Sequence, residues 1–322
     1  EKETNMKILE FMRNWTLPIS MGTGVASYFI LSGAECLRPY HPYMSKVVDA
    51  LQPILIFSML FLSFCKIKPK ELKLVPWQWK LLCLQGGTFI ALGGLLALMP
   101  EAEWRILVEA AMICFICPTA TAAIVVTGKL GGNTGSLTMF TILGNLSTAI
   151  LVPLMIPVIH PQGETHFIGN FLQIIGRVFP LLFCPFILAM LLQWVCPRLV
   201  ERIVKIKDMA FYLWTVALAI AMCITTKSLM RSPFPIYYEI SIAAISLLAC
   251  IAQFAIGRKL GCKDGEPLSA GQAAGQKNTI FAIWMSYTFL TPVTSLAGGF
   301  YSVWHNVYNS YQLYQKRKNK PV

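Results

Sequence analysis

Two apolar segments of this chain are each interrupted by a short polar stretch. One interruption covers residues 117–121 and carries Pro118, and the other covers residues 271–279. Backbone in contact with lipid cannot leave its N–H and C=O groups unpaired, so a broken helix persists at membrane depth only where protein or a watery cavity pairs them. Discontinuous helices in corresponding halves of a chain are typical of secondary transporters, whose substrate site lies at the breaks.

The composition supports a membrane protein. The chain has 322 residues, of which 56% are hydrophobic and 13% are charged, and this balance lies far from that of soluble domains. About 20 apolar residues are needed to cross a bilayer as a helix. By this measure the sequence predicts ten spans, near 14–33, 43–64, 77–99, 103–130 (broken), 133–158, 167–195, 207–228, 233–256, 266–289 (broken) and 291–313.

The span count predicts an internal repeat. Five spans precede the short loop around Gly163 and five follow it. An odd number of spans per half forces the second half to enter from the opposite side, so the repeats are inverted in topology. We therefore expect an all-α integral membrane protein, a single transporter unit over 1–322, with inverted repeats at about 14–158 and 167–313 and two crossing broken helices.

The net charge of +12 reflects topology rather than nucleic-acid binding. Most Lys and Arg residues fall on one predicted face, which is the positive-inside pattern, so both termini are predicted to be cytoplasmic in a bacterial inner membrane. The expected partners are the lipid bilayer and a small organic anion, with no nucleic acid. The opposite, non-cytoplasmic face holds only Arg38, Lys46, Arg105, Lys227 and Arg231.

Each break exposes the N-terminus of a second half-helix, where free N–H groups and the positive end of the helix dipole attract anions. These half-helices are predicted to begin near 119–122 and 277–279, and Lys277 adds a full charge. Polar groups at mid-depth of the last span also need partners, in the substrate or in a neighbouring helix. The candidate substrate-binding residues are Thr119, Ala120, Thr121, Lys277, Asn278, Thr279, His305 and Asn306.

Several tracts resemble the bile acid:sodium symporter family, in particular its bacterial-type members. They are the Pro-Thr-Ala-Thr-Ala tract at 118–122 with Gly-Asn at 132–133, the tract at 275–278, and above all Ser-Val-Trp-His-Asn at 302–306. The resemblance implies a core domain (77–158 and 233–313) and a panel domain (14–64 and 167–228). It also implies alternating access for organic anions of the bile acid, pantoate or 2-oxo acid class.

The sequence departs from the sodium-coupled members of that family. Gln272 stands where they carry a glutamate, Lys277 where they carry an asparagine, and Ala123 and Ile124 where they carry Ser-Asn. A hard cation requires oxygen ligands, so we expect altered or absent sodium coupling, and sodium-coupled bile acid symport is the alternative. No cofactor or metal is expected. The candidate ion-site or coupling residues are Gln272, Gln276, Lys277, Thr138 and Thr141; the threonines also suit helix packing.

Lys277 admits three interpretations. Its ammonium could replace the coupling cation, or it could bind the substrate anion directly, in which case its proton could be carried with the substrate. Alternatively, its long side chain could extend to the membrane surface, as Lys often does. The first two interpretations predict a loss of transport, or of its pH dependence, when the amine is removed.

A membrane-embedded enzyme is the rival from another functional class. No span carries H-E-x-x-H, paired intramembrane aspartates or a Ser/His pair at catalytic spacing, so no catalytic residue is predicted. The acids Asp49, Glu109 and Glu239 lie within about two turns of the non-cytoplasmic end of their spans. A solvated vestibule or an interfacial ion pair explains them equally well.

Overall fold

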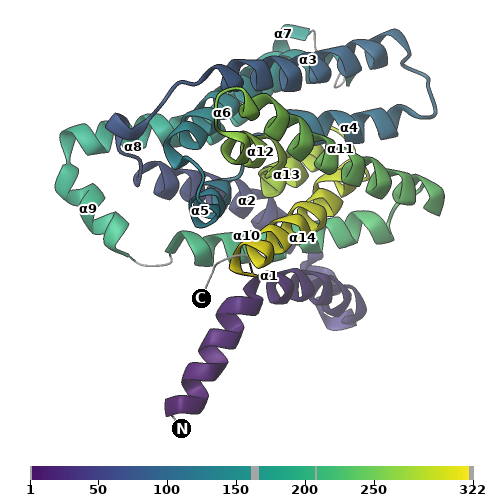
Figure 1. Cartoon of the computed structure of the whole chain (residues 1–322). Helices are drawn as coiled ribbons and strands as arrows, with labels where there is room; N and C mark the ends of the chain where they lie inside the picture. Colours follow the sequence, from purple (N-terminus) through teal and green to yellow (C-terminus); the bar gives the residue numbers. More distant parts are fainter. Residues whose placement is uncertain (1, 161–166, 207–208, 319–322) are drawn as a thin grey trace.

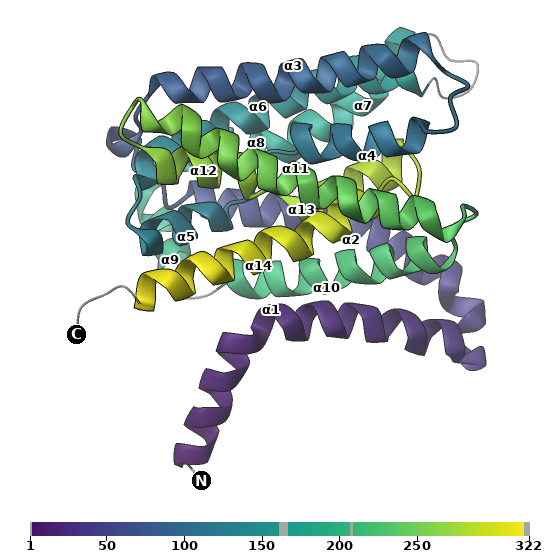
Figure 2. The ribbon, with the colours of Figure 1, turned by 45° about the vertical axis from the view of Figure 1, so that its right-hand side comes forward.

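The structure is a computed structural model that describes residues 2–160, 167–206 and 209–318, without the side chains of 2–17, 35, 37 and 38. Its described residues form helices and connecting turns, and the long helices lie side by side (Figures 1 and 2). The first half contains α1 (Lys2–Gly33), η1 (Glu35–Tyr40), α2 (His41–Phe64), η2 (Pro69–Glu71), α3 (Pro76–Leu98), α4 (Arg105–Ile116), α5 (Ala122–Leu130) and α6 (Thr134–Ile159). The second contains α7 (Phe167–Leu182), α8 (Cys184–Val195), α9 (Pro197–Lys205), α10 (Met209–Met230), α11 (Ile236–Cys262), α12 (Pro267–Gly275), α13 (Thr279–Phe289) and α14 (Leu296–Lys318).

Both predicted breaks are present. The first separates α4 from α5 and the second separates α12 from α13, and each broken pair is followed by one long helix, α6 or α14. In the described residues, α2, α3, α6, α10 and α11 are each long and apolar enough to cross a membrane, and α7 with α8 adds a sixth span if the pair is counted as one. The protein is therefore an all-helical, multi-pass membrane protein. The ten-span inverted repeat stays a prediction.

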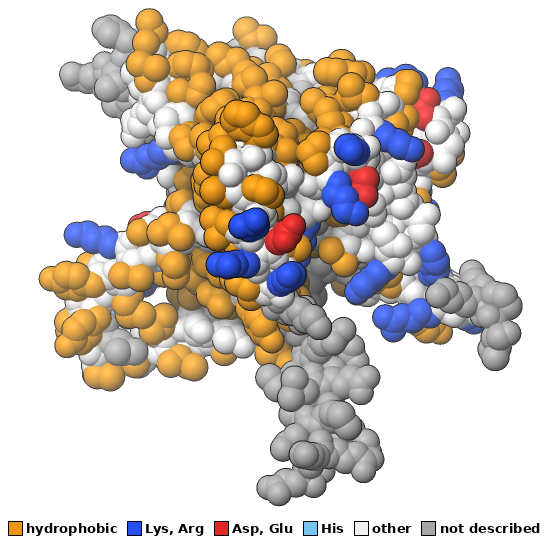
Figure 3. All heavy atoms as spheres, turned by 90° about the vertical axis from the view of Figure 1, so that its left-hand side faces the viewer, with side chains coloured by type: hydrophobic (Ala, Val, Ile, Leu, Met, Phe, Trp, Pro, Cys, Tyr) orange, Lys and Arg blue, Asp and Glu red, His pale blue; other side chains and the backbone are white. Residues whose placement is uncertain are grey.

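The surface of the protein also fits a position in the membrane. Figure 3 shows a broad apolar surface next to a region, near the C-terminus, where Lys and Arg side chains gather. Basic residues end several helices at this side of the bundle, including Lys129 on α5, Lys205 on α9 and the last turn of α14. Apolar surface of this extent is stable only when lipid covers it.

Two elements differ from the sequence expectation. The predicted span at 167–195 is bent by 42° between α7 and α8, where Pro185 lies in the first turn of α8. Proline cannot donate an N–H to the preceding turn, but it is tolerated at a helix start, so it marks a third discontinuity. The basic loop after this span forms the short helix α9, with Val200 buried. The loop around Gly163 lies outside the described residues.

Close packing positions the second broken pair against α11. A Cβ on Gly257 would lie 2.5 Å from the backbone oxygen of Ala270, and a Cβ on Gly261 would lie 2.5 Å from that of Glu266. Small residues four apart allow two helix backbones to approach in this way. Glycine at both positions therefore lets α12 lie directly on α11. This contact sets the position of Gly275, the last residue of α12.

Candidate functional site at the helix crossing

The two broken segments cross and pair through their backbones. Thr119 and Lys277 form an antiparallel β-bridge. The N–H of Ala120 donates to the oxygen of Gln276 at 2.9 Å, and the N–H of Asn278 donates to the oxygen of Pro118 at 2.8 Å. Residues nearly half the chain apart thus satisfy each other's non-helical backbone, as a break at membrane depth requires.

Carbonyls at the ends of the first half-helices also need donors, because the last turn of a helix leaves its C=O groups unpaired. Side chains from other elements supply these donors. The pairs are Gln253 Nε2 to Cys114 O (2.9 Å), Thr148 Oγ1 to Ile116 O (2.8 Å), Thr119 Oγ1 to Ala273 O (2.7 Å) and Tyr301 Oη to Gly275 O (2.8 Å). Thr119, predicted to bind substrate, thus has its hydroxyl committed to α12.

Lys277 is a further side-chain donor to these half-helix carbonyls. Its side chain is 1% exposed, and its Nζ donates to the oxygen of Phe115, in the last turn of α4, at 3.2 Å. None of the described carboxylates lies within 4.0 Å of this amine. The interpretation that Lys277 extends to the membrane surface is therefore wrong. The amine instead lies at the negative end of the α4 dipole, where a cation is stabilised.

A small cavity of about 40 Å³ lies beside the crossing. One wall is polar and comes from α5, the α12–α13 break and α14; the other is apolar and comes from α2 and α10. Most of the predicted substrate residues meet here. The polar wall consists of Ala120, Thr121, Ala122, Gln276, Lys277, Asn278, Thr279, Ser302, His305 and Asn306, and the apolar wall includes Ile56, Met59, Leu60 and Trp214.

Three polar atoms of this wall are buried and have no hydrogen-bond partner among the described residues: Gln276 Oε1, Ser302 Oγ and His305 Nδ1. The ring of His305 meets that of Tyr301 edge-on, with centroids 5.7 Å apart, which fixes its orientation without using that nitrogen. Buried polar atoms are nearly always paired in native proteins, and an unpaired group calls for an explanation such as water, an ion or a ligand. These three atoms make the cavity a candidate binding site.

The two exposed half-helix N-termini differ. No side-chain hydrogen bond caps α5, which begins at Ala122 after Thr121. The side chain of Asn278, by contrast, accepts a hydrogen bond from the N–H of Phe281 at 3.2 Å and so caps α13. Both half-helices begin where the sequence predicted. Only the α5 terminus lacks a side-chain cap, so it is the stronger anion-binding end.

Two of the predicted ion-site residues lie elsewhere. The hydroxyls of Thr138 and Thr141 donate to the oxygens of Thr134 and Leu137 on their own helix, at 2.7 and 3.0 Å. Neither residue lines the cavity. This back-bonding uses the donor of each hydroxyl, and a role of the two threonines in an ion site stays a prediction.

Gln272 belongs to a separate buried amide cluster. Its Nε2 donates to Asn309 Oδ1 at 3.0 Å and to Gln312 Oε1 at 3.2 Å, and Arg258 Nη2 donates to the same Gln312 oxygen at 3.0 Å. The sequence analysis missed this cluster, and Ser302 as well. The signal was present: Ser302, His305, Asn309 and Gln312 recur every three to four residues and form one polar stripe on α14.

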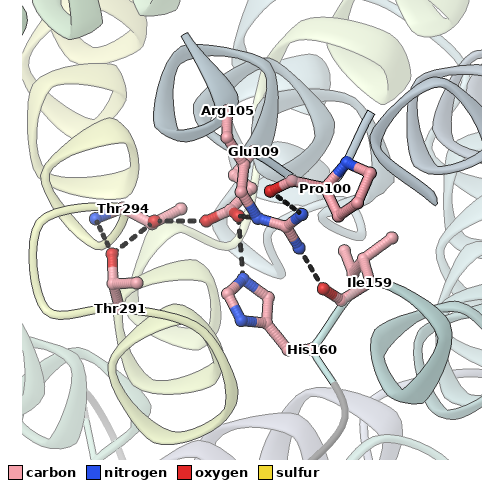
Figure 4. A network of polar contacts seen from close by, with 7 residues as sticks. All are labelled: Pro100, Arg105, Glu109, Ile159, His160, Thr291 and Thr294. Atoms are coloured by element: carbon pink, nitrogen blue, oxygen red, sulfur yellow. Dashed lines mark hydrogen bonds and ion pairs between the residues drawn. The ribbon is translucent and has the colours of Figure 1, made fainter. Parts of the chain in front are cut away.

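A second polar network surrounds Glu109, at the other end of α4 (Figure 4). The carboxylate, 1% exposed, receives hydrogen bonds from Arg105 Nε (3.0 Å), His160 Nε2 (2.8 Å) and Thr294 Oγ1 (2.9 Å). Arg105 also donates to the oxygen of Ile159. Of the two explanations left open by the sequence, the structure favours the ion pair over the solvated vestibule.

Comparison with known proteins identifies the family. The family model described as the SBF-like CPA transporter family matches residues 22–314, which is most of the chain. A search of curated proteins returns no significant match. The matched region contains both helix breaks, the cavity and the polar stripe of α14. This multi-pass membrane protein therefore belongs to the SBF-like CPA transporter family, in agreement with its resemblance to the bile acid:sodium symporters.

Proposed function

We propose that this protein carries an organic anion across the membrane by alternating access, and that Lys277 supplies the positive charge that a coupling cation provides in related carriers. The observation that carries the proposal is the position of Lys277: fully buried, without a carboxylate partner, and in the lining of a cavity with unpaired polar atoms. A buried charge is retained only where it is compensated, and a substrate anion would compensate it.

The size of the cavity supports a moving carrier. Sites for organic ligands usually enclose about 300–1,000 Å³, whereas this cavity has about 40 Å³. An anion can enter only if the apolar wall on α2 and α10 separates from the polar wall. These walls fall in the predicted panel and core domains, respectively. We infer that relative motion of the two domains, related by an inverted repeat of ten spans, opens the site to either side.

The polar wall has the chemistry of a carboxylate or sulfonate site. The uncapped start of α5, the Ser302 hydroxyl and the His305 ring can donate hydrogen bonds to anionic oxygens, and the cation of Lys277 lies nearby. Bile acids, pantoate and 2-oxo acids all carry such a group. A thermal-stability screen of the purified protein with each anion identifies the substrate, since a ligand of the folded state raises its stability by mass action.

Sodium coupling is absent in this proposal. Lys277 contacts a carbonyl of α4, and Gln272, at the position of the family glutamate, is engaged with Asn309 and Gln312. Neither position offers the anionic oxygen that a hard cation needs. Uptake by proteoliposomes is expected to be equal in sodium and in choline medium. Strong stimulation by sodium would contradict this part of the proposal and favour sodium-coupled symport.

The role of Lys277 is tested with Lys277→Gln, compared with Lys259→Gln as a matched control because Lys259 is exposed at the end of α11. A permanent cation surrogate predicts loss of uptake at every pH. If Lys277 instead carries a proton with the substrate, uptake persists in the variant but loses its pH dependence. Wild-type uptake and affinity of Lys277→Gln across the pH range would contradict both roles of Lys277.

We infer that the face rich in Lys and Arg is cytoplasmic, together with both termini, by the positive-inside rule. The basic region near the C-terminus in Figure 3 supports this orientation. Reporter enzymes that are active on only one side of the membrane, fused to the C-terminus, test it. Activity of a reporter that works only outside the cytoplasm would reverse the assignment.

A further inference from the structure

A second and larger cavity, of about 310 Å³, lies at the opposite end of the bundle from the basic face. It is bounded by α1, α2 and α10. Both α1 and α2 pack along α10, but they make little contact with each other, so a groove runs between them over the surface of α10. The short helix η1 joins α1 to α2 at this end. The cavity shares no lining residue with the one at the crossing.

The lining of this cavity is amphipathic. Its body is apolar, with Leu31, Met44, Val48, Ile220 and Ile224 among its residues. The lining also carries the charged or polar side chains of Asp49, Lys227, Arg231 and Tyr287, and the thiol of Cys223. Such a combination fits a ligand with an apolar chain and an anionic head.

The two cations in the lining form no ion pair with a described acidic side chain. Lys227 Nζ lies 3.0 Å from Tyr287 Oη and 5.6 Å from the centre of that ring, and Arg231 is exposed. Among the described side chains, no carboxylate lies within 4.0 Å of either cation. Asp49 is exposed in the same lining, so the cationic charge of Lys227 and Arg231 exceeds the anionic charge.

The distribution of Lys and Arg on the predicted non-cytoplasmic face points to the same cavity. The predicted non-cytoplasmic face carries five basic residues, and Arg105 is paired with Glu109. Of the other four, Lys227 in the last turn of α10 and Arg231 directly after this helix line the cavity. Because Lys and Arg are depleted on this face of membrane proteins, the presence of two of them in one cavity lining requires a separate explanation.

We propose that this cavity binds an anionic membrane lipid, with its headgroup at Lys227 and Arg231 and its acyl chain in the groove between α1 and α2. A lipid fits better than a dissolved anion because the helices that form the groove present apolar side chains to the bilayer: Phe29 and Ile30 on α1 and Val47 and Ile54 on α2 are exposed. Basic pockets between membrane helices on the cytoplasmic or matrix side bind anionic headgroups, and Lys227 and Arg231 offer the same charge on the opposite face. This site goes beyond the proposed transport function and does not depend on it.

Cys223 allows a test in the wild-type protein, because this cysteine is free, half-buried and part of the lining. The protein is reconstituted in nanodiscs of phosphatidylcholine, with or without phosphatidylglycerol, and treated with N-ethylmaleimide. Mass spectrometry then follows alkylation of Cys223, with the exposed Cys262 at the other end of the bundle as internal control. We expect phosphatidylglycerol to slow alkylation of Cys223 several-fold and to leave that of Cys262 unchanged.

Variants test whether the lipid headgroup causes the protection of Cys223 from alkylation. In Lys227→Gln/Arg231→Gln the protection is expected to disappear, whereas Lys46→Gln, on α2 but outside the lining, should keep it. If the double variant does not fold, Arg231→Gln alone is expected to reduce the protection, since this side chain is exposed. Equal alkylation rates in both lipids would overturn the proposal. Protection by taurocholate in phosphatidylcholine discs without any effect of phosphatidylglycerol would overturn it too, in favour of a dissolved anion.

Discussion

The two buried polar regions attached to α4 differ in how fully they are paired. At its N-terminal end, both carboxylate oxygens of Glu109 have partners from three different elements. At its C-terminal end, beside the crossing, the cavity wall holds three polar atoms with none. A fully paired network holds its elements in one arrangement, whereas a partly paired one is costly unless something else completes it. The comparison separates a structural junction from a binding site.

The difference predicts opposite responses to mutation. Loss of Glu109 removes the acceptor that Arg105, His160 and Thr294 share, so the cost falls on stability. Loss of a polar atom in the cavity wall removes a group that already lacks a protein partner, so the cost falls on substrate binding. The predictions below test this division in order of expected effect.

The largest effect is expected for Glu109→Ala. It leaves Arg105, His160 and Thr294 without their shared carboxylate, and losing hydrogen bonds to a charged group of this kind costs about 1.5–3 kcal/mol. Thermal unfolding of the purified protein should show a strongly lowered midpoint. Glu103→Ala, in an exposed position before α4, is the control and should change stability by less than about 0.5 kcal/mol. A normal midpoint for Glu109→Ala would show that the network does not clamp the helices.

The next effect concerns Asn306→Leu in the cavity wall. The Asn306 amide donates only to Ser302 O on its own helix, at 2.6 Å, so its loss should leave the protein folded. A leucine there removes a polar group from a small site, and we expect uptake to fall by about tenfold or more, equivalent to about 1.4 kcal/mol. Uptake and unfolding are measured on the same preparation. Unfolding without a separate loss of uptake would place Asn306 with the structural residues.

A smaller effect is expected for Ser302→Ala. The hydroxyl is buried without a partner, so its removal should leave the free energy of unfolding unchanged or slightly raise it, within about 1 kcal/mol. Affinity for the transported anion should fall several-fold. Ser286→Ala is the matched control, because the Ser286 hydroxyl donates to Ala282 O on its own helix. A large loss of stability in Ser302→Ala would contradict the division between the two regions.

The smallest effect is expected for Thr141→Val. This hydroxyl donates to its own helix and lies outside the cavity lining, and such bonds contribute little to helix stability. Uptake should stay within about twofold of the wild-type value, comparable with the scatter of neutral surface changes. A marked loss of uptake, or a change in its response to sodium, would show that Thr141 reaches the site in another conformation.

The sequence predicted the crossing because its causes are local. Proline and polar residues interrupt apolar runs at 117–121 and 271–279, and backbone left unpaired at depth must find a partner. Arg105 lies four residues before Glu109 on the same helix, so this partner follows from the spacing. His160 and Thr294 could not be predicted in the same way, since only the fold brings them to the carboxylate. The hydroxyl partners of Thr138 and Thr141 could not be predicted, because spacing fixes a helical face but not which acceptor a hydroxyl finds. The bend at α7–α8 was missed because Pro185 is compatible with an intact helix start.

The antiparallel bridge between Thr119 and Lys277 has a consequence for how the chain is made. When the first half leaves the ribosome, the carbonyls of Pro118 and Phe115 have no donors, since these donors belong to Asn278 and Lys277. The first broken helix thus enters the bilayer with these carbonyls unpaired. They gain their donors only when the second broken helix is inserted. We expect a fragment that ends after α6 to be degraded in the cell, and to be rescued when the complementary half is produced with it.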